Sequence, residues 1–235
     1  MANILAIDSS TEACSVALSY QGETFQLFKH EPRKHAELLL PMVDQLLNQA
    51  GTKLDSLDAI ACCAGPGAFT GLRIAISIAQ GLAYANRLPC IAVSSLEILA
   101  FQAFKEFDCN VSIAALDARM SEVYFSIFNK SENNLTDEIY PSEVIAPEAI
   151  LLDQTCLDSF SDAKVCLVGN GWQNYTFSDS VNSVNGEQLD ILFPRADMML
   201  PLAQRDYQLE KLCKPEFLQP VYLRNKVAKK KSEQK

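Results

Sequence analysis

The stretch Asn3-Ile4-Leu5-Ala6-Ile7-Asp8-Ser9-Ser10-Thr11 decides the fold class of this chain. Its first six residues are mostly apolar and end in a carboxylate, which is typical of a buried strand, and the three hydroxyl side chains that follow predict a polar turn. Residues 14–20 resume a strand, Gln21-Gly22 predicts a hairpin turn, and residues 23–30 predict a third strand. The chain therefore opens with a three-stranded antiparallel meander that carries Asp-x-x-Thr at its first turn.

Two helices with broad apolar surfaces follow the meander. Residues 35–50 predict the first, and Gly51 is a natural stop. A short apolar strand at residues 58–64 leads through a glycine-rich turn into the second helix, at residues 72–86. In each helix the apolar arc covers roughly 200°, although one core-facing stripe needs only ~100°. The surplus apolar surface must face something besides one sheet.

The second half of the chain repeats the β-β-β-α-β-α order of the first half in pattern, not in residue identities. The first half ends with a strand at residues 90–93 and a helix at 96–104 that Ser94 or Ser95 caps. The second half predicts strands at 111–117, 122–129, 138–145 and 164–169, a short helix at 147–155, a loop-rich stretch at 172–195, a helix at 197–212 and an extended segment at 215–224. We expect an α/β fold of two subdomains, residues 1–105 and 106–212, then an extended segment at 213–225 and a basic disordered tail at 226–235.

Composition narrows the class of protein. The 235 residues are 49% apolar and 21% charged, a balance that excludes disorder over most of the chain. No apolar run reaches the ~20 residues that span a bilayer, and no signal peptide is visible. The eight cysteines form no CxxC pair, so we expect reduced thiols and a cytoplasmic protein. With only two histidines, a structural zinc site is disfavoured.

The charge is unevenly distributed. Five lysines against one glutamate give residues 226–235 a net charge of +4, which leaves −13 on residues 1–225. An acidic body disfavours a broad nucleic-acid surface. The basic end is either a contact for RNA or an acidic partner, or a solvated terminus.

Two turns are candidates for phosphate chemistry. At the first, Asp8, Ser10 and Thr11 offer hydroxyl and backbone groups for a phosphate or a metal-bound water; the alternative is an aspartate that bonds its own turn. The second, Gly65-Pro66-Gly67-Ala68-Phe69-Thr70-Gly71, precedes a helix N-terminus that favours anions, with Gly65, Gly67, Thr70 and Gly71 as candidate contacts. It matches neither the P-loop nor the Rossmann fingerprint. Here the alternative is a conformational requirement of the turn, with Thr70 capping the helix.

The remaining reactive side chains are weak candidates for a metal or catalytic site. His30 and His35 are five residues apart and do not suit a metal pair on one helix. Asp117, Arg119 and Glu122 are either catalytic groups or members of a solvated turn.

Six stretches together resemble the bacterial TsaB (also called YeaZ) family, which takes part in making threonylcarbamoyladenosine in tRNA. They are Ile4 to Leu18, His35-Ala-Glu-Leu-Leu-Leu-Pro41, Gly65-Pro-Gly-Ala-Phe-Thr-Gly-Leu-Arg-Ile74, Val93-Ser-Ser-Leu-Glu97, Ala115-Leu-Asp-Ala-Arg119 and Pro220-Val-Tyr-Leu-Arg224. The resemblance implies the duplicated actin/Hsp70/sugar-kinase (ASKHA) fold. It also implies a non-catalytic partner of TsaD, the related subunit that modifies adenosine 37 of tRNAs reading ANN codons, in an assembly that the ATPase TsaE joins. Contact with tRNA is then expected only through the complex, and no membrane contact is expected.

Two departures from relatives support a non-catalytic role. Ser95 and Leu99 stand where TsaD-like proteins carry a metal-binding histidine pair. The turn at residues 117–121 has no glycine, although nucleotide-binding relatives carry glycines there that let phosphate approach the backbone. We therefore expect no resident cofactor, with a degenerate or interface-shared ADP or ATP site left open.

The surplus apolar surface predicts where a partner binds. Side by side, helices 35–50 and 71–86 would form a four-helix bundle with a matching pair from TsaD or from a second copy of this chain, so the homodimer and the heterodimer would exclude each other. The expected contacts are His35, Leu38, Leu39, Met42, Leu46, Leu72, Ala75, Ile76, Ala79 and Leu82. On this interpretation, Leu39→Glu or Ala75→Glu breaks binding and leaves the fold intact. The alternative is that the C-terminal segment covers this surface internally.

Two enzymatic hypotheses compete with the subunit hypothesis. One is a small-molecule kinase of the same fold superfamily, in which Asp8 and Asp117 hold Mg-ATP. The other is a metallopeptidase, against which the missing histidine pair argues.

Overall fold

The opening residues form the predicted meander. The computed structural model, which describes residues 1–224, pairs β1 (Ile4–Asp8) antiparallel with β2 (Cys14–Tyr20) and β2 with β3 (Glu23–Lys29). Gln21 and Gly22, with φ of 50° and 86°, make the tight turn between β2 and β3. The predicted tail at 226–235 lies outside the described residues.

Two parallel strands complete the first sheet. β4 (Ala59–Gly65) pairs parallel with β1, and β5 (Cys90–Ser94) pairs parallel with β4, so the order is β3-β2-β1-β4-β5. β1 and β4 are fully buried, which explains their continuous apolar sequences. Because β1, β4 and β5 are parallel, the turns after Asp8 and Gly65 lie at the same edge of the sheet.

The second sheet repeats this topology strand for strand. Its order is β10-β9-β6-β7-β8, with β6–β7–β8 as the antiparallel meander and β9 and β10 added parallel on the other side of β6. Its strands are β6 (Val111–Arg119), β7 (Glu122–Lys130), β8 (Thr136–Ile145), β9 (Val165–Val168) and β10 (Gly186–Gln188). The predicted duplicated α/β fold is confirmed. The sequence-based interpretation missed β10, because three residues with one glycine carry no alternating pattern.

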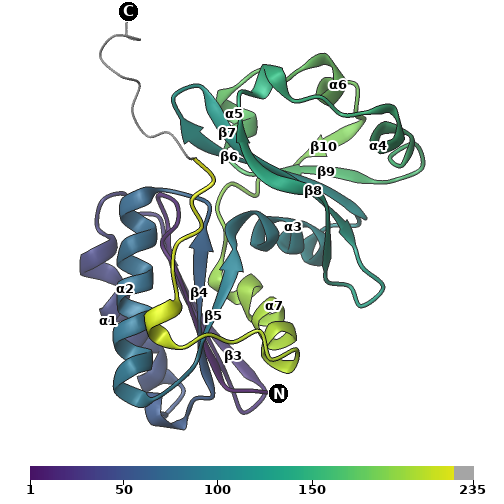
Figure 1. Ribbon diagram of the computed structural model, residues 1–235. Coiled ribbons are helices and arrows are strands. Elements are labelled where there is room, and N and C mark those ends of the chain that lie inside the picture. Colours follow the sequence, from purple (N-terminus) through teal and green to yellow (C-terminus); the bar gives the residue numbers. More distant parts are fainter. Residues whose placement is uncertain (225–235) are drawn as a thin grey trace, which may run out of the picture.

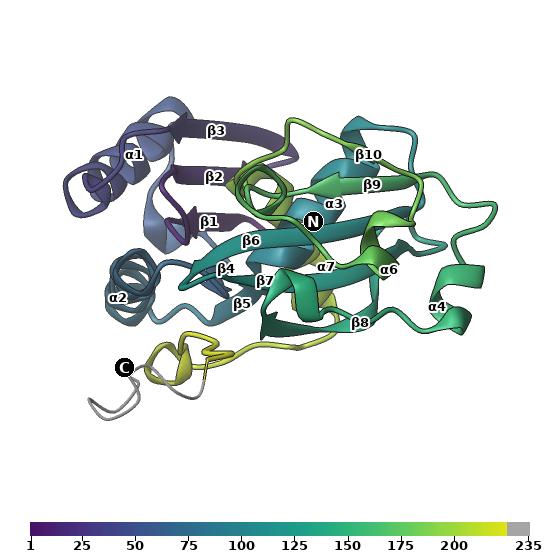
Figure 2. The same cartoon turned by 90° about the horizontal axis from the view of Figure 1, so that it is seen from above.

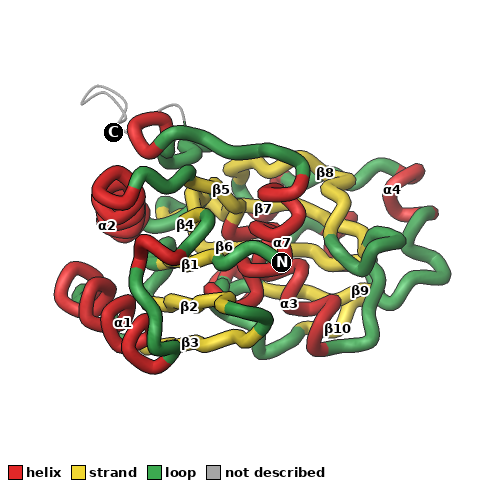
Figure 3. Tube along the Cα trace, turned by 90° about the horizontal axis from the view of Figure 1, so that it is seen from below, coloured by secondary structure: helices red, strands yellow, loops and turns green. Residues whose placement is uncertain are grey.

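The helices separate into an outer pair and an inner pair (Figure 1). The outer pair, α1 (His35–Gln49) and α2 (Phe69–Asn86), covers one face of the first sheet (Figure 2). The inner pair lies between the two sheets: α3 (Ser95–Glu106) packs on strands of both, and α7 (Ala196–Gln208) packs on the first (Figure 3). A helix from the second half of the chain thus helps to build the core of the first.

Short helices complete the second half. They cover the outer face of the second sheet, where Ile150, Phe160 and Phe177 are buried against it. They are α4 (Gln154–Asp158), α5 (Gly171–Asn174) and α6 (Asp179–Asn182), and the 3-10 turns of the chain are η1 (Leu54–Ser56), η2 (Pro147–Ala149) and η3 (Pro215–Phe217). The stretch 172–195, expected as loop, therefore holds two single-turn helices and β10.

The start of α2 corrects one prediction. The helix begins at Phe69, not Leu72, and its N-cap is Ala68, so Thr70 lies inside the first turn and is not the cap. No described side chain caps this helix, and the Ala68 N–H instead donates to the Ser10 carbonyl at 2.7 Å. By contrast, the predicted cap of α3 is confirmed: Ser94 Oγ accepts from the Glu97 N–H.

Candidate functional site

The first candidate turn is closed to solvent. Asp8, Ser10 and Thr11 are all buried, and Asp8 Oδ1 accepts the Ser10 N–H at 2.8 Å. Asp8 Oδ2 and Ser10 Oγ have no hydrogen-bond partner among the described residues. The Thr11 carbonyl lies 2.7 Å from Nε2 of His35, at the first turn of α1. These groups hold α1 against the meander and do not form an open phosphate site.

The glycine turn packs directly on this first turn. A Cβ atom added at Gly67 would lie much closer than 3.0 Å to the carbonyl oxygen of Ser10. One added at Gly71 would likewise lie far inside this limit from the carbonyl oxygen of Ser9. Ser9 Oγ also donates to the Gly71 carbonyl at 2.9 Å. The chain's own hairpin therefore occupies the space beside the N-terminus of α2 where a phosphate would approach. Gly65 is buried with a φ of +104°, which a glycine adopts readily.

The second half shows the same arrangement. Built Cβ atoms at Gly169 and Gly171 would both lie inside 3.0 Å of the Ala115 carbonyl, at the equivalent strand. Asp117, the second candidate carboxylate, is already engaged: Oδ1 accepts from the Arg119 N–H and from the Tyr175 hydroxyl, each at 2.7 Å. In both halves the glycines provide close contact between a turn and a strand end.

An ion-pair chain joins the two meanders. The Arg119 guanidinium lies 3.2 Å from Asp117 Oδ2 and 3.3 Å from Glu12 Oε1. The glycine-free turn that carries it places Arg119, Met120 and Ser121 at φ of 62°, 56° and 61°. Three successive side chains in the left-handed region are uncommon, so contacts from elsewhere must hold this turn. Among residues 1–224, no group of three or more His, Cys, Asp or Glu side chains could hold a metal ion.

Burial raises the pKa of the Asp8 carboxyl above its ordinary value, and the hydrogen bond from the Ser10 N–H opposes this rise. A carboxyl with a higher pKa in the folded protein stabilises the fold at acidic pH and loses that contribution as the pH rises through the folded pKa. Asp8→Asn keeps an acceptor for the Ser10 N–H and cannot ionise. We expect this variant to unfold at a higher temperature than wild type near neutral pH, with the difference shrinking toward about pH 4.

Thermal melts of the two proteins across this pH range test the Asp8 prediction. Greater stability of the wild type at neutral pH would contradict it, because the carboxyl at Asp8 would then favour the fold more than the amide does.

The predicted partner surface needs correction at the level of residues. Two of the ten expected contacts, Leu38 and Leu82, are partly buried. The other eight are buried within this chain alone: His35, Leu39, Met42, Leu46, Leu72, Ala75, Ile76 and Ala79. Their side chains pack toward the sheet and the opposite helix, so they have almost no exposed apolar area to offer a partner.

A different set of residues forms an exposed groove between α1 and α2. Leu40 and Phe69 are 48% and 52% exposed, and both line it. The groove measures about 530 Å³ and is lined by Ala36, Leu40, Phe69, Thr70, Arg73, Ile74, Ser77 and Ile78. We call it the α1–α2 groove. Of the predicted site residues, only Thr70 lies in it.

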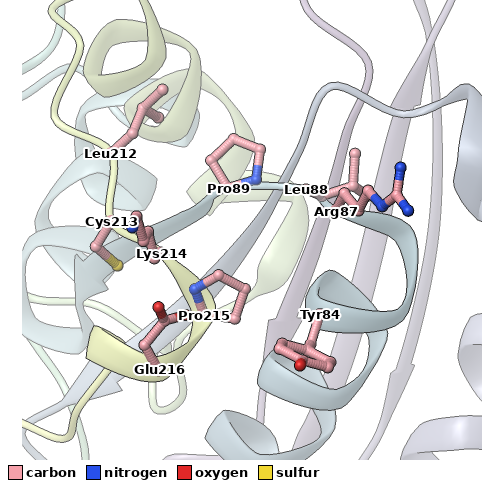
Figure 4. A pocket seen from close by; sticks show the side chains of 9 residues that line it. All are labelled: Tyr84, Arg87, Leu88, Pro89, Leu212, Cys213, Lys214, Pro215 and Glu216. Atoms are coloured by element: carbon pink, nitrogen blue, oxygen red, sulfur yellow. The ribbon is translucent and has the colours of Figure 1, made fainter.

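Another cavity, of about 640 Å³, lies beyond the C-terminal end of α2 (Figure 4). Tyr84 and Arg87 line it from α2 and its cap, and the segment from Leu212 to Glu216 lines it from the opposite side. Lys214 and Glu216 bring opposite charges to the same wall, so the cavity favours no single class of ligand.

No described helix is long and apolar enough to cross a membrane.

Comparison with known proteins identifies relatives over the whole length. The family model for TsaD, tRNA N6-adenosine threonylcarbamoyltransferase, matches residues 29–232. Proteins named "tRNA threonylcarbamoyladenosine biosynthesis protein TsaB" are 40% identical in Escherichia coli, over 97% of both chains, and 38% identical in Haemophilus influenzae, over 97% of this chain and 96% of the relative.

Solved structures agree with the sequence relatives. YeaZ from Pseudomonas aeruginosa is 39% identical and superposes with a TM-score of 0.84 over 95% of this chain and 100% of its own. A second structure, described as an uncharacterized protein with similarity to peptidase YeaZ from Pseudomonas aeruginosa, gives a TM-score of 0.86 with the same identity and coverage.

Proposed function

This chain belongs to the TsaB (YeaZ) family of tRNA threonylcarbamoyladenosine biosynthesis proteins, and from this we propose that it is a non-catalytic subunit that docks on TsaD. In this proposal, docking stabilises the active form of TsaD, which transfers threonylcarbamoyl to adenosine 37 of ANN-reading tRNAs. TsaE joins the assembly, and tRNA contacts this chain only within it.

The α1–α2 groove is the observation that carries the proposal. It exposes Leu40 and Phe69 beside the half-buried Ile74 and Ile78, all from two helices that lie side by side. An exposed apolar groove of this kind is typical of a helix-packing interface, in which two helices of a partner would complete a four-helix bundle. The partner would be TsaD or a second copy of this chain, and the two complexes would exclude each other.

The closed turns support a non-catalytic role. Close contacts at Gly67 and Gly71 leave no room for a phosphate against the backbone, and Asp117 is engaged by Arg119 and Tyr175. A kinase would need both turns open and both carboxylates available to Mg-ATP. No feature of the described residues favours the kinase hypothesis, and the word peptidase is part of the description of a structural neighbour.

Mixing experiments test the proposal. We expect this protein and TsaD from the same organism to elute together as a heterodimer in size-exclusion chromatography with light scattering, and to need each other for full transferase activity on tRNA. This protein alone is expected to transfer nothing. Transferase activity from this chain in the absence of TsaD, or separate elution at concentrations well above micromolar, would overturn the proposal.

A further inference from the structure

The chain returns to α2 after its last helix. Residues 213–224, which we call the C-terminal strap, run along α2 and the edge of β5 toward the second half (Figure 1, yellow). Cys213 exchanges two backbone hydrogen bonds with Cys90, at 2.8 and 2.9 Å. Leu218 is 1% exposed in the core beneath α2, and its carbonyl accepts from Gln80 at 2.9 Å. The strap is thus part of the folded first half.

The strap delivers an aromatic side chain to the α1–α2 groove. The Tyr222 and Phe69 rings stack at 5.7 Å between centroids, and the Arg73 guanidinium lies 3.8 Å from the centre of the Phe69 ring. Arg73 Nε also donates to the Tyr222 hydroxyl at 3.1 Å. Phe69 and Arg73 line the groove, so the 46%-exposed Tyr222 extends its wall onto the strap.

Two anchors hold Tyr222 in this position. On one side, the Val221 N–H donates to the Ala64 carbonyl at 2.8 Å, at the end of β4. On the other side, Arg224 pairs with Glu122 and donates to the carbonyls of Ala118 and Arg119 at 3.2 and 3.3 Å. Arg224 therefore ties the strap to the left-handed β6–β7 turn of the second half, and Tyr222 is ordered before any partner binds.

We propose that the C-terminal strap is part of the docking face for TsaD, and that Phe69, Arg73 and Tyr222 supply most of its binding energy. This inference rests on the proposed function. Tyr and Arg are enriched among the residues that dominate binding energy, and side chains that are already ordered lose less entropy when they bind. The partner is that of the proposed function, because Tyr222 stacks on the same Phe69 that lines the groove.

Tyr222→Ala tests the inference against a control at another exposed tyrosine, Tyr84 on α2. We expect this variant to weaken the affinity for TsaD by about thirtyfold or more, whereas Tyr222→Phe, which keeps the ring, loses only a few fold. Tyr84→Ala removes an equally aromatic side chain, 77% exposed at the far end of α2, and is expected to bind like wild type. Calorimetric or interferometric titration measures the dissociation constants, and thermal melts verify folding.

The outcomes separate this inference from the proposed function. If wild type binds TsaD and Tyr222→Ala binds equally well, the strap is not part of the face and the inference fails. If wild type does not bind at all, the proposed function fails instead. Arg73→Ala gives a second test on α2, with the sequence of the strap unchanged: it should lose about tenfold or more, and an unchanged affinity would also contradict the inference.

Discussion

Leu39→Glu is expected to unfold this protein, whereas Leu40→Glu, one residue further along α1, leaves it folded and abolishes docking on TsaD. Leu39 is 0% exposed in the core between α1 and the first sheet, and Leu40 is 48% exposed in the α1–α2 groove. Removing a buried leucine costs about 2–5 kcal/mol, and an unpaired carboxylate in its place adds several more. The sum is comparable to the total stability of about 5–15 kcal/mol of most native proteins.

Circular dichroism and size-exclusion chromatography of the two variants test this prediction. A folded Leu39→Glu protein that fails to bind TsaD would restore the sequence-based interpretation, in which Leu39 contacts the partner. A Leu40→Glu protein that binds normally would mean that the α1–α2 groove is not the docking face.

The difference between Leu39 and Leu40 shows what helical periodicity can establish. The apolar arcs on residues 35–50 and 72–86 correctly indicated more apolar surface than one sheet can cover. Periodicity fixes the width of such an arc but not its centre. That centre depends on the crossing of α1, α2 and the first sheet, which only the fold determines. The predicted contacts therefore lie about one helical position nearer the core than the residues that line the groove.

The strap shows a second limit of the sequence. Residues 215–224 carry no strong periodicity, so they predicted an extended segment and nothing about its path. Their path depends on separate contacts far apart in the chain, such as Leu218 beneath α2 and Val221 beside Ala64. The strap covers one flank of α2, as the alternative hypothesis expected, but leaves the α1–α2 groove open. The meanders and the repeated order of elements were easier to predict, because each meander and each crossover is local in sequence.

The sequence left the role of the glycine turns open for a chemical reason. A phosphate against a helix N-terminus and a carbonyl oxygen against the same turn both require a residue without a Cβ, so Gly67 and Gly71 fit either hypothesis. Only the position of the first hairpin distinguishes them. The Ser9 and Ser10 carbonyls occupy the space, and the Ala68 N–H, which could have bound an anion, donates to Ser10.

Gly71→Ala and Gly81→Ala place the same substitution ten residues apart in α2, and we expect opposite effects on stability. At Gly81, which is exposed and has open space around it, alanine raises helix propensity and should stabilise the protein by about 0.5–1 kcal/mol. At Gly71 the same gain is outweighed, because the new methyl group would overlap the backbone carbonyl of Ser9. Relieving that overlap moves the hairpin and breaks the Ser9–Gly71 hydrogen bond, at a cost of about 3 kcal/mol or more.

Denaturant titration of both variants measures the two changes in the free energy of unfolding, and Gly81→Ala controls for helix propensity. A Gly71→Ala protein as stable as wild type would mean that the turn tolerates a Cβ and has room for a ligand. The phosphate hypothesis would then regain its basis. A large loss of stability would remove the basis of the phosphate hypothesis, since a glycine that the fold itself requires needs no ligand to explain it. On that outcome, the two turns serve to fix α2, and with it the groove, against the first sheet.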